Sequence, residues 1–179
     1  MKNKVLLVVD MQNDFITGSL GTPEAQAILP AVQEKIAQYM AGGSVVIFTR
    51  DTHGEDYLNT PEGKKLPVPH CIMGTQGWEI ADGLYKEGCF ILDKPTFGLL
   101  NIAEEITKRM CGARIEAIEI IGLCTDICVV SNALILKAAA PDLPLIVDAS
   151  CCAGVNPESH KAALLTMKMC QVNVEESFH

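Results

Sequence analysis

The chain has 179 residues, of which 49% are hydrophobic and 20% charged, so it can bury a substantial core and is not a disordered segment. This length predicts a single domain over residues 1–179. Asp and Glu number 22 against 14 Lys and Arg, which gives a formal net charge of -8. A chain with this balance lacks the basic surface that binds nucleic acid or anionic membranes, and we expect neither as a partner.

Hydropathy and cysteine content indicate the cellular compartment. No apolar run approaches the roughly 18 residues that span a bilayer. The first apolar run, residues 5–9, ends at Asp10 and is too short for the core of a secretion signal. Eight cysteines in a chain this rich in apolar residues favour free thiols, because disulfide-stapled secreted domains are usually shorter. We therefore expect a cytoplasmic protein.

Apolar, β-branched runs alternate with helical segments along the chain. The runs predict strands at residues 5–9, 44–49, 90–92, 115–121, 145–147 and 172–174. The segments between them predict helices at 24–40, with Pro30 placed to begin a second helix, and at 99–110, 125–140 and 158–170. Strands without polar alternation are typical of a parallel sheet covered on both faces. The sequence therefore predicts an α/β fold, a three-layer sandwich around a mostly parallel six-stranded sheet.

Reactive side chains follow three of the predicted strands. Asp10 ends the first strand, Lys94 follows the third, and Cys128 falls in the first turn of the helix after the fourth. Ligands of open parallel sheets bind beyond the carboxyl ends of the strands. A carboxylate leaving an apolar strand is suited to proton transfer, and the amino end of a helix favours a thiolate and an oxyanion.

Each of these residues also has a purely structural interpretation. Asp10 can cap a turn, Lys94 can be a surface residue, and Cys128 can be a buried thiol without reactivity. Position alone does not decide between the two interpretations.

A long segment, residues 50–77, interrupts the regular alternation. It is rich in proline and glycine and supplies Asp51, His53, Glu62 and His70. Two imidazoles and two carboxylates suit a borderline or hard divalent cation, with Zn, Fe and Mn all compatible. The four side chains can also be solvated polar groups of a surface loop.

Taken together, these segments resemble the isochorismatase-like cysteine hydrolases, and within them the nicotinamidases. The resemblance covers essentially the whole chain. It rests on V-D-M-Q-N-D-F at 9–15, T-R-D-T-H at 49–53, P-H-C at 69–71, Lys94 with Phe97, and G-L-C-T-D-I-C-V at 122–129. It implies the isochorismatase-like hydrolase fold, with strand order 3-2-1-4-5-6.

The resemblance also implies roles for individual residues. It implies a catalytic triad of Asp10, Lys94 and Cys128, and an oxyanion hole formed by the backbone N–H groups of Cys124 and Cys128 after a cis peptide at 123–124. The implied metal ligands are Asp51, His53, Glu62 and His70, and the implied substrate contacts are Phe15, Phe97 and Leu123. Residues 66–69 hold no aromatic side chain, where similar enzymes have one.

The function implied is hydrolysis of nicotinamide to nicotinate and ammonia through a thioester, with one divalent metal ion, Zn in the first instance. Relatives are commonly oligomers, so a homo-oligomer is expected. One alternative keeps the fold and nucleophile but acts without metal on another small amide, a carbamoyl or a ureido compound. Another is a binding or redox-sensing module with reversibly oxidised cysteines and a structural metal.

Overall fold

The computed structural model describes residues 3–176. Its centre is one six-stranded sheet in which neighbouring strands are all parallel, in the order β3-β2-β1-β4-β5-β6. This confirms the predicted strand order. The strands are β1 (Lys4–Val9), β2 (Val45–Asp51), β3 (Phe90–Lys94), β4 (Ala117–Leu123), β5 (Leu145–Ala153) and β6 (Asn173–Glu175).

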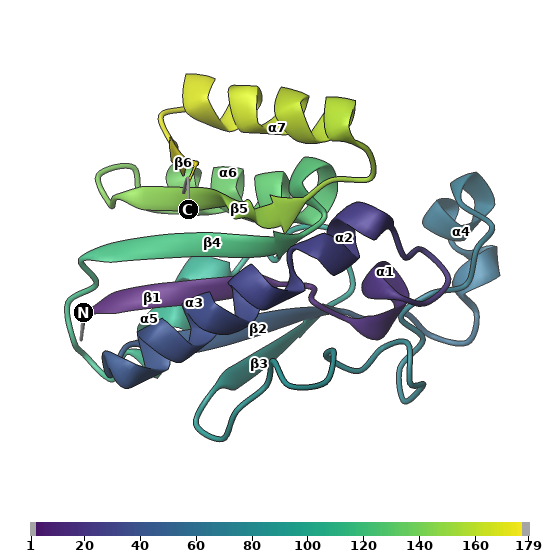
Figure 1. Cartoon of the computed structure of the whole chain (residues 1–179), viewed down its shortest axis with the longest axis horizontal. Coiled ribbons are helices and arrows are strands. Elements are labelled where there is room, and N and C mark those ends of the chain that lie inside the picture. The colour runs from purple at the N-terminus through teal and green to yellow at the C-terminus, as the bar shows by residue number, and fades with distance from the viewer. Residues whose placement is uncertain (1–2, 177–179) are drawn as a thin grey trace.

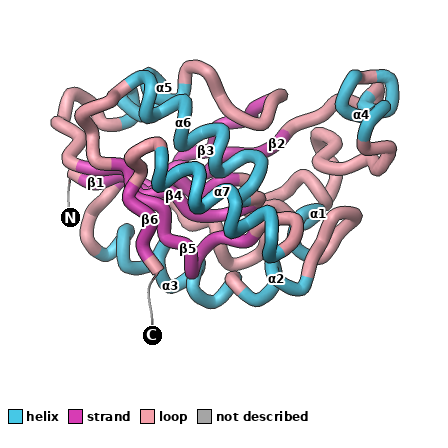
Figure 2. The backbone as a smooth tube through the Cα atoms, turned by 90° about the horizontal axis from the view of Figure 1, so that it is seen from above, coloured by secondary structure: helices cyan, strands magenta, loops and turns pink. Residues whose placement is uncertain are grey.

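Helices cover both faces of the sheet, which confirms the three-layer architecture (Figures 1 and 2). One face is covered by α2 (Pro23–Ala27) and α3 (Leu29–Ala41), and the other by α5 (Ile102–Arg109), α6 (Val130–Ala139) and α7 (Pro157–Met169). Two further helices, α1 (Asn13–Ile16) and α4 (Pro61–Lys65), lie beyond the carboxyl ends of the strands (Figure 1). None of the helices within residues 3–176 has the length and apolar character to cross a membrane.

The segment 24–40 forms two helices joined at Ile28, and Pro30 occupies the first turn of the second, as predicted, where its missing N–H costs nothing. Several other boundaries differ from the sequence prediction. Strands β2, β3, β4 and β5 all run past their predicted ends. As a result Asp51 and Lys94 are the last residues of strands and not loop residues, because backbone pairing continues to Asp51↔Lys94. The short helices α1 and α4 were not predicted.

The central strands are buried along their length, as their unbroken apolar sequences predict. In β4 every residue is buried, and in β1 only the first is partly exposed. At the carboxyl end of these two strands, Gly122 has φ +115°, and a Cβ there would lie 2.1 Å from the carbonyl oxygen of Val9. Glycine thus permits the close approach of β1 and β4 at the point where both strands end.

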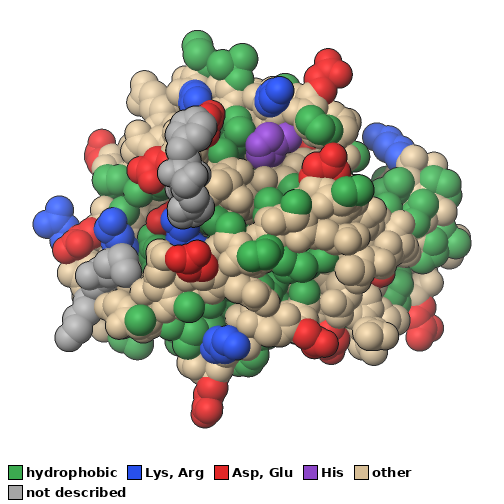
Figure 3. Space-filling model, in the orientation of Figure 1, with side chains coloured by type: hydrophobic (Ala, Val, Ile, Leu, Met, Phe, Trp, Pro, Cys, Tyr) green, Lys and Arg blue, Asp and Glu red, His purple; other side chains and the backbone are tan. Residues whose placement is uncertain are grey.

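The charges are distributed as the composition suggests. On the face drawn in Figure 3, acidic and basic side chains are interspersed, with hydrophobic side chains between them. This distribution offers no single basic patch on that face.

Candidate active site

Three side chains that lie at or just beyond the carboxyl ends of three strands meet at the switch point of the sheet. The Lys94 Nζ lies 2.7 Å from Asp10 Oδ2 and 3.4 Å from the Cys128 Sγ. Asp10 and Lys94 are fully buried, and Cys128 is 4% exposed. Lysine is almost never fully buried unless it is paired, so the surface-residue interpretation of Lys94 is wrong.

Two hydrogen bonds with Thr49, one to the backbone and one to the carboxylate, hold Asp10 in place. Asp10 has φ 47°, in the left-handed region that Asp tolerates better than most residues. Its N–H donates to the Thr49 carbonyl at 3.2 Å, and the Thr49 hydroxyl donates to Oδ1 at 2.6 Å. Thr49 was not singled out from the sequence, although its place beside Val9 across the β1–β2 pairing could have suggested it.

The electrostatics of the three groups oppose each other. Burial raises the pKa of Asp10, against the attraction of Lys94. Burial and then the negative charge of Asp10 raise the pKa of the Cys128 thiol well above its ordinary value. Although burial lowers the pKa of Lys94, the surrounding negative charges, Asp10 first, raise it overall. A charged lysine thus stands between two groups that both favour holding a proton.

The turn that carries Cys128 begins at a cis peptide between Leu123 and Cys124, as the resemblance implied. A π-helical turn, Thr125–Val129, follows it and leads into α6. The N–H groups of Ile127 and Val129 both donate to the Cys124 carbonyl at 3.1 Å. The N–H of Cys128, which lies between them in the sequence, takes no part in these two bonds. A helix start of this kind offers N–H groups to a developing negative charge.

Side chains of the following helix and of α7 brace this turn. Asn132, fully buried, donates to the Cys128 carbonyl at 2.8 Å and accepts from the Leu99 N–H at 3.0 Å. The Thr125 hydroxyl lies 2.8 Å from Nδ1 of His160, which belongs to α7. None of these contacts was predicted, and those with Leu99 and His160 join segments far apart in the sequence.

A second cluster contains three of the four predicted metal ligands. One ligand atom from each of Asp51, His53 and His70 lies within 4.8 Å of the other two. Asp51 Oδ2 is 2.9 Å from His53 Nε2 and 3.6 Å from His70 Nε2. His70 donates from Nδ1 to the Val68 carbonyl at 2.9 Å, which leaves its Nε2 free to bind a cation.

This cluster fits a divalent cation. Among residues 3–176, the buried Nε2 of His53 has no hydrogen-bond partner of acceptable geometry, although Asp51 is close. An imidazole nitrogen converging with a second imidazole and a carboxylate is the donor set of zinc and similar ions.

The fourth predicted ligand, Glu62, lies at the edge of the cluster. It is on α4, and its Oε1 is 3.8 Å from Nε2 of both His53 and His70. Glu62 is not among the three residues whose ligand atoms lie within 4.8 Å of one another. Its partial exposure, 24% of the side chain, places it at the open side of the cluster.

Side chains from separate segments of the chain hold the metal cluster in place. The fully buried Gln12 side chain accepts from the Asp51 N–H at 2.7 Å and donates to the Asp51 carbonyl at 2.9 Å. Asp14 accepts from the N–H of Cys71, the neighbour of His70, at 2.8 Å. Tyr57 packs against both imidazoles, with ring centroids 4.7 Å from His53 and 4.9 Å from His70.

The two clusters share a contact. Lys94 Nζ lies 3.4 Å from Asp51 Oδ1, while the other oxygen of Asp51 faces the imidazoles. Although burial raises the pKa of Asp51, its close contacts with His53 and His70 and the charge of Lys94 lower it overall, so the carboxylate is ionised. Lys94 therefore joins the carboxylate beside the thiol to a carboxylate of the metal cluster.

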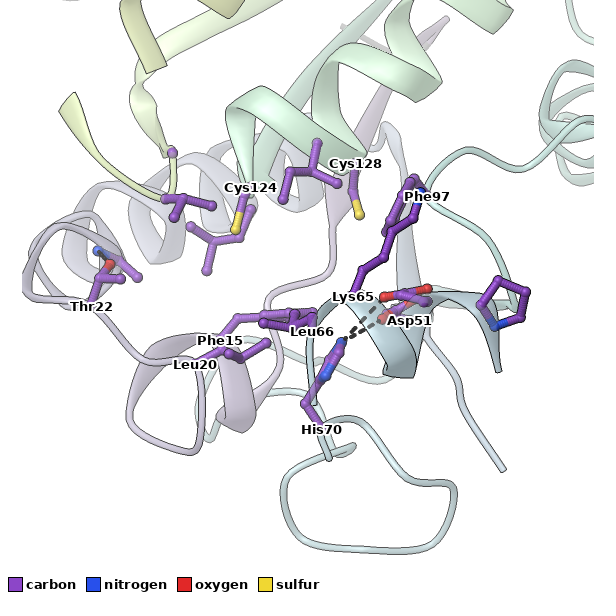
Figure 4. Close-up of a pocket in the computed structure, with 17 residues that line it drawn as sticks. Phe15, Leu20, Thr22, Asp51, Lys65, Leu66, His70, Phe97, Cys124 and Cys128 are labelled. Carbon is purple, nitrogen blue, oxygen red and sulfur yellow. Dashed lines mark hydrogen bonds and ion pairs between the residues drawn. The ribbon is translucent and has the colours of Figure 1, made fainter. Parts of the chain in front are cut away.

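Both clusters open into one cavity of about 540 Å³ (Figure 4). Cys128, Asp51, Glu62 and His70 line it, as do the three predicted substrate contacts Phe15, Phe97 and Leu123. Phe15 also packs against His70, with ring centroids 5.6 Å apart. Phe97 is 45% exposed, so it is not a core side chain.

Comparison with known proteins agrees with this geometry. The Isochorismatase domain matches residues 4–177. The nicotinamidase/pyrazinamidase of Mycobacterium tuberculosis is 28% identical, over 96% of this chain and 97% of the relative. The pyrazinamidase of Pyrococcus horikoshii in complex with zinc superposes with a TM-score of 0.79 at 26% identity, covering 98% and 99% of the two chains. The N-carbamoylsarcosine amidase of Thermoplasma acidophilum does so with a TM-score of 0.80 at 25% identity, covering 100% and 98%. The chain therefore belongs to the isochorismatase family.

Proposed function

We propose that this protein is a metal-assisted cysteine amidohydrolase that converts nicotinamide to nicotinate and ammonia. One observation supports this above the others: the Lys94-bridged pair of Asp10 and Cys128 opens into the same cavity as the Asp51–His53–His70 cluster. The similarity to a nicotinamidase/pyrazinamidase of another organism supports nicotinamide as the substrate. Nicotinate made in this way would enter NAD salvage in the cytoplasm.

The proposed reaction begins with proton transfer from Cys128 to Asp10. The pKa of Asp10 is raised by burial, so the carboxylate is a stronger base than an exposed Asp. As the thiol loses its proton, Lys94 stabilises the negative charge on sulfur from 3.4 Å. The thiolate then attacks the carboxamide carbon and forms a carbon–sulfur bond.

The tetrahedral intermediate carries its negative charge on the former carbonyl oxygen. The backbone N–H groups of Cys124 and Cys128 donate to this oxygen in our proposal. When the carbon–nitrogen bond breaks, Asp10 returns its proton to the leaving nitrogen and ammonia departs. Asp10 then takes a proton from water, which attacks the thioester and releases nicotinate and the Cys128 thiol.

Asp51, His53 and His70 would hold the metal ion, with Glu62 at its open side. When bound, a divalent ion supplies Lewis acidity to a ring nitrogen of the substrate or to a water in the cavity. The donor set and the zinc-containing structure from Pyrococcus horikoshii favour zinc, while Fe and Mn remain compatible with the ligands.

One observation favours a second candidate. The resemblance to N-carbamoylsarcosine amidase supports hydrolysis of a carbamoyl compound by the same three residues. The buried donor set of Asp51, His53 and His70 favours the metal-assisted reaction over this one, because a metal-independent hydrolase has no need of it.

The test is ammonia release from nicotinamide by the purified protein, with N-carbamoylsarcosine as the second substrate. Each is measured before chelation, after chelation and after addition of Zn²⁺, with Cys128→Ala as the blank. We expect release from nicotinamide that stops on chelation and returns with the metal. Release from N-carbamoylsarcosine alone, unaffected by chelation, would establish the second candidate instead.

A further inference from the structure

The active-site cavity extends well beyond the reactive groups. At one end lie Cys128, Asp51, His70 and the two side chains Lys65 and Glu62 of α4. Figure 4 shows Leu20 and Thr22 on the far side of the open space from Cys128, Phe97 and Asp51, with Cys124 between. We call the second part the distal end and define it by its lining residues Leu20, Thr22, Ala25 and Val155.

The distal end differs from the reactive end in polarity. All of its side chains are apolar except that of Thr22, and the Thr22 hydroxyl already accepts from the Ala25 N–H at 3.0 Å. Two backbone N–H groups there are also paired: Leu20 N–H donates to the Asp14 carbonyl at 2.9 Å, and Val155 N–H donates to the Asp126 carboxylate at 3.1 Å. Apart from the Thr22 hydroxyl, the side chains of this wall therefore present hydrocarbon to a ligand.

The volume of the cavity exceeds what a single small ring requires. About 540 Å³ lies within the range of sites that enclose drug-sized ligands. A pyridine carboxamide placed between Cys128 and the Asp51–His53–His70 cluster occupies only the reactive end. The distal end would then hold water against an apolar wall, and displacing such water with an apolar group is favourable.

We propose that the distal end is a subsite for an uncharged, apolar substituent on the acyl part of the substrate. The preferred substrates are then primary carboxamides of a heteroaromatic ring that carries an aryl or alkyl extension, and nicotinamide is the smallest member of this class. The inference rests on the proposed function for its chemistry, but the shape and polarity of the distal end are independent of it.

Binding tests the subsite without requiring turnover. The Zn²⁺-loaded protein is titrated by calorimetry with nicotinate and with 5-phenylnicotinate, which adds one apolar ring and leaves the ring nitrogen and carboxylate unchanged. Since one methylene in an apolar pocket is worth about 10-fold or more, we expect the phenyl compound to bind at least about 10-fold more tightly. Equal or weaker binding of the phenyl compound would overturn the inference.

Variants locate the effect. Val155→Trp fills the distal end and should remove the advantage of 5-phenylnicotinate while leaving nicotinate affinity within about twofold. Leu165→Trp is the matched control, because Leu165 is 60% exposed on α7 and does not line the cavity. Leu20→Ala removes apolar contact without adding bulk and should weaken only the phenyl compound. Loss of affinity for both ligands, or loss in the control as well, would contradict the subsite.

Hydrolysis separates this inference from the proposed function. We expect kcat/KM for 5-phenylnicotinamide to exceed that for nicotinamide by about 10-fold, mainly through KM. Cleavage of nicotinamide without any preference for the phenyl compound would reject the subsite and keep the proposed function. Tighter binding of 5-phenylnicotinate with no cleavage of either amide would keep the subsite and reject the function.

Discussion

Two lysines of this protein, Lys94 and the partly exposed Lys35, make the same kind of contact in different places. Lys94 bridges Asp10 at 2.7 Å and Asp51 at 3.4 Å, and Lys35 bridges Glu119 at 2.7 Å and Asp148 at 2.8 Å. Each therefore neutralises two carboxylates carried by separate strands or strand ends. The pairing alone does not distinguish a reactive lysine from a structural one.

Their surroundings do distinguish them. Lys94 is fully buried at the carboxyl ends of the strands and contacts the Cys128 thiol, which lines the cavity. Lys35 comes from α3, and Glu119 and Asp148 stand within β4 and β5, away from the strand ends. In our proposal, position along the parallel strands separates the catalytic ion pair of Lys94 from the structural one of Lys35.

The Lys35 cluster makes further contacts inside the protein. The Tyr39 hydroxyl donates to Glu119, and the Ser150 hydroxyl donates to Asp148 at 2.6 Å. Although burial lowers the pKa of Lys35, its two carboxylate partners raise it overall, so the lysine is charged. The network links α3 to β4 and β5, and we expect it to contribute to stability and not to turnover.

The largest effect is expected at the thiol itself. Cys128→Ala removes the nucleophile and should lower kcat by at least about 10⁴-fold, because groups that act as a unit lose most of their effect together. Steady-state ammonia release measures it, with thermal unfolding to confirm the fold. Activity within tenfold of the wild type would place the reaction elsewhere.

Replacing the reactive lysine should affect both activity and stability. Lys94→Met leaves Asp10 and Asp51 buried without their cation, and should lower the free energy of unfolding by about 3–5 kcal/mol. We expect kcat to fall by about 10²-fold or more, because Asp10 is no longer held and the thiolate loses its counter-charge. Urea unfolding and ammonia release give the two values, and an active Lys94→Met protein would refute the comparison.

Metal removal should affect the same region. Chelation leaves Asp51, His53 and His70 without their ion, and the protein loses the stabilisation that binding gives, about 2.7 kcal/mol at a free metal concentration 100 times Kd. Tm should fall on chelation and recover with Zn²⁺. The matched control is His53→Ala, whose Tm should not respond to Zn²⁺ to the same extent.

Replacing the structural lysine should change stability alone. Lys35→Met breaks the contacts to Glu119 and Asp148, but its side chain is 19% exposed, so water can partly replace it. We expect the free energy of unfolding to fall by about 2 kcal/mol and kcat/KM to stay within about twofold. A large loss of turnover in the folded variant would show that the two lysines do not differ as described.

The smallest effect concerns acid stability. Burial raises the pKa of Asp148, but its contacts with Lys35 and Ser150 lower it overall. A carboxyl group whose pKa is lower in the folded state stabilises the protein above its unfolded pKa of about 4, and this stabilisation is lost as the pH falls toward the folded value. Lys35→Met should weaken this dependence, so wild type and variant should differ less in stability at low pH than at neutral pH.

The sequence predicted the parts of the site that depend on the path of the chain through the sheet. Asp10, Lys94 and Cys128 stand at or just beyond strand ends, and unbroken apolar runs marked those strands. Their convergence followed from strand order, which the resemblance supplied. Asp51 and His53 were recognised as ligand types, although Asp51 proved to be the end of β2.

The residues that hold the site could not be predicted in the same way. Gln12 binds both backbone groups of Asp51, 39 positions away, and Tyr57 packs against two imidazoles from a 3-10 turn that the sequence did not suggest. Such contacts depend on how loops fold against each other, and no periodic pattern encodes them. Glu62 lies at the edge of the cluster because α4 presents it from the outside.

The most direct test of the account is a search for the acyl-enzyme. The zinc-loaded protein is mixed with nicotinamide, quenched in acid within milliseconds and digested. The mass of the peptide that contains Cys128 is then measured by mass spectrometry. We predict a mass increase of one nicotinoyl group on Cys128 in the wild type and in Lys35→Met, and none in Cys128→Ala. Ammonia release by an unmodified wild type, with Cys128→Ala still active, would contradict a reaction centred on this thiol.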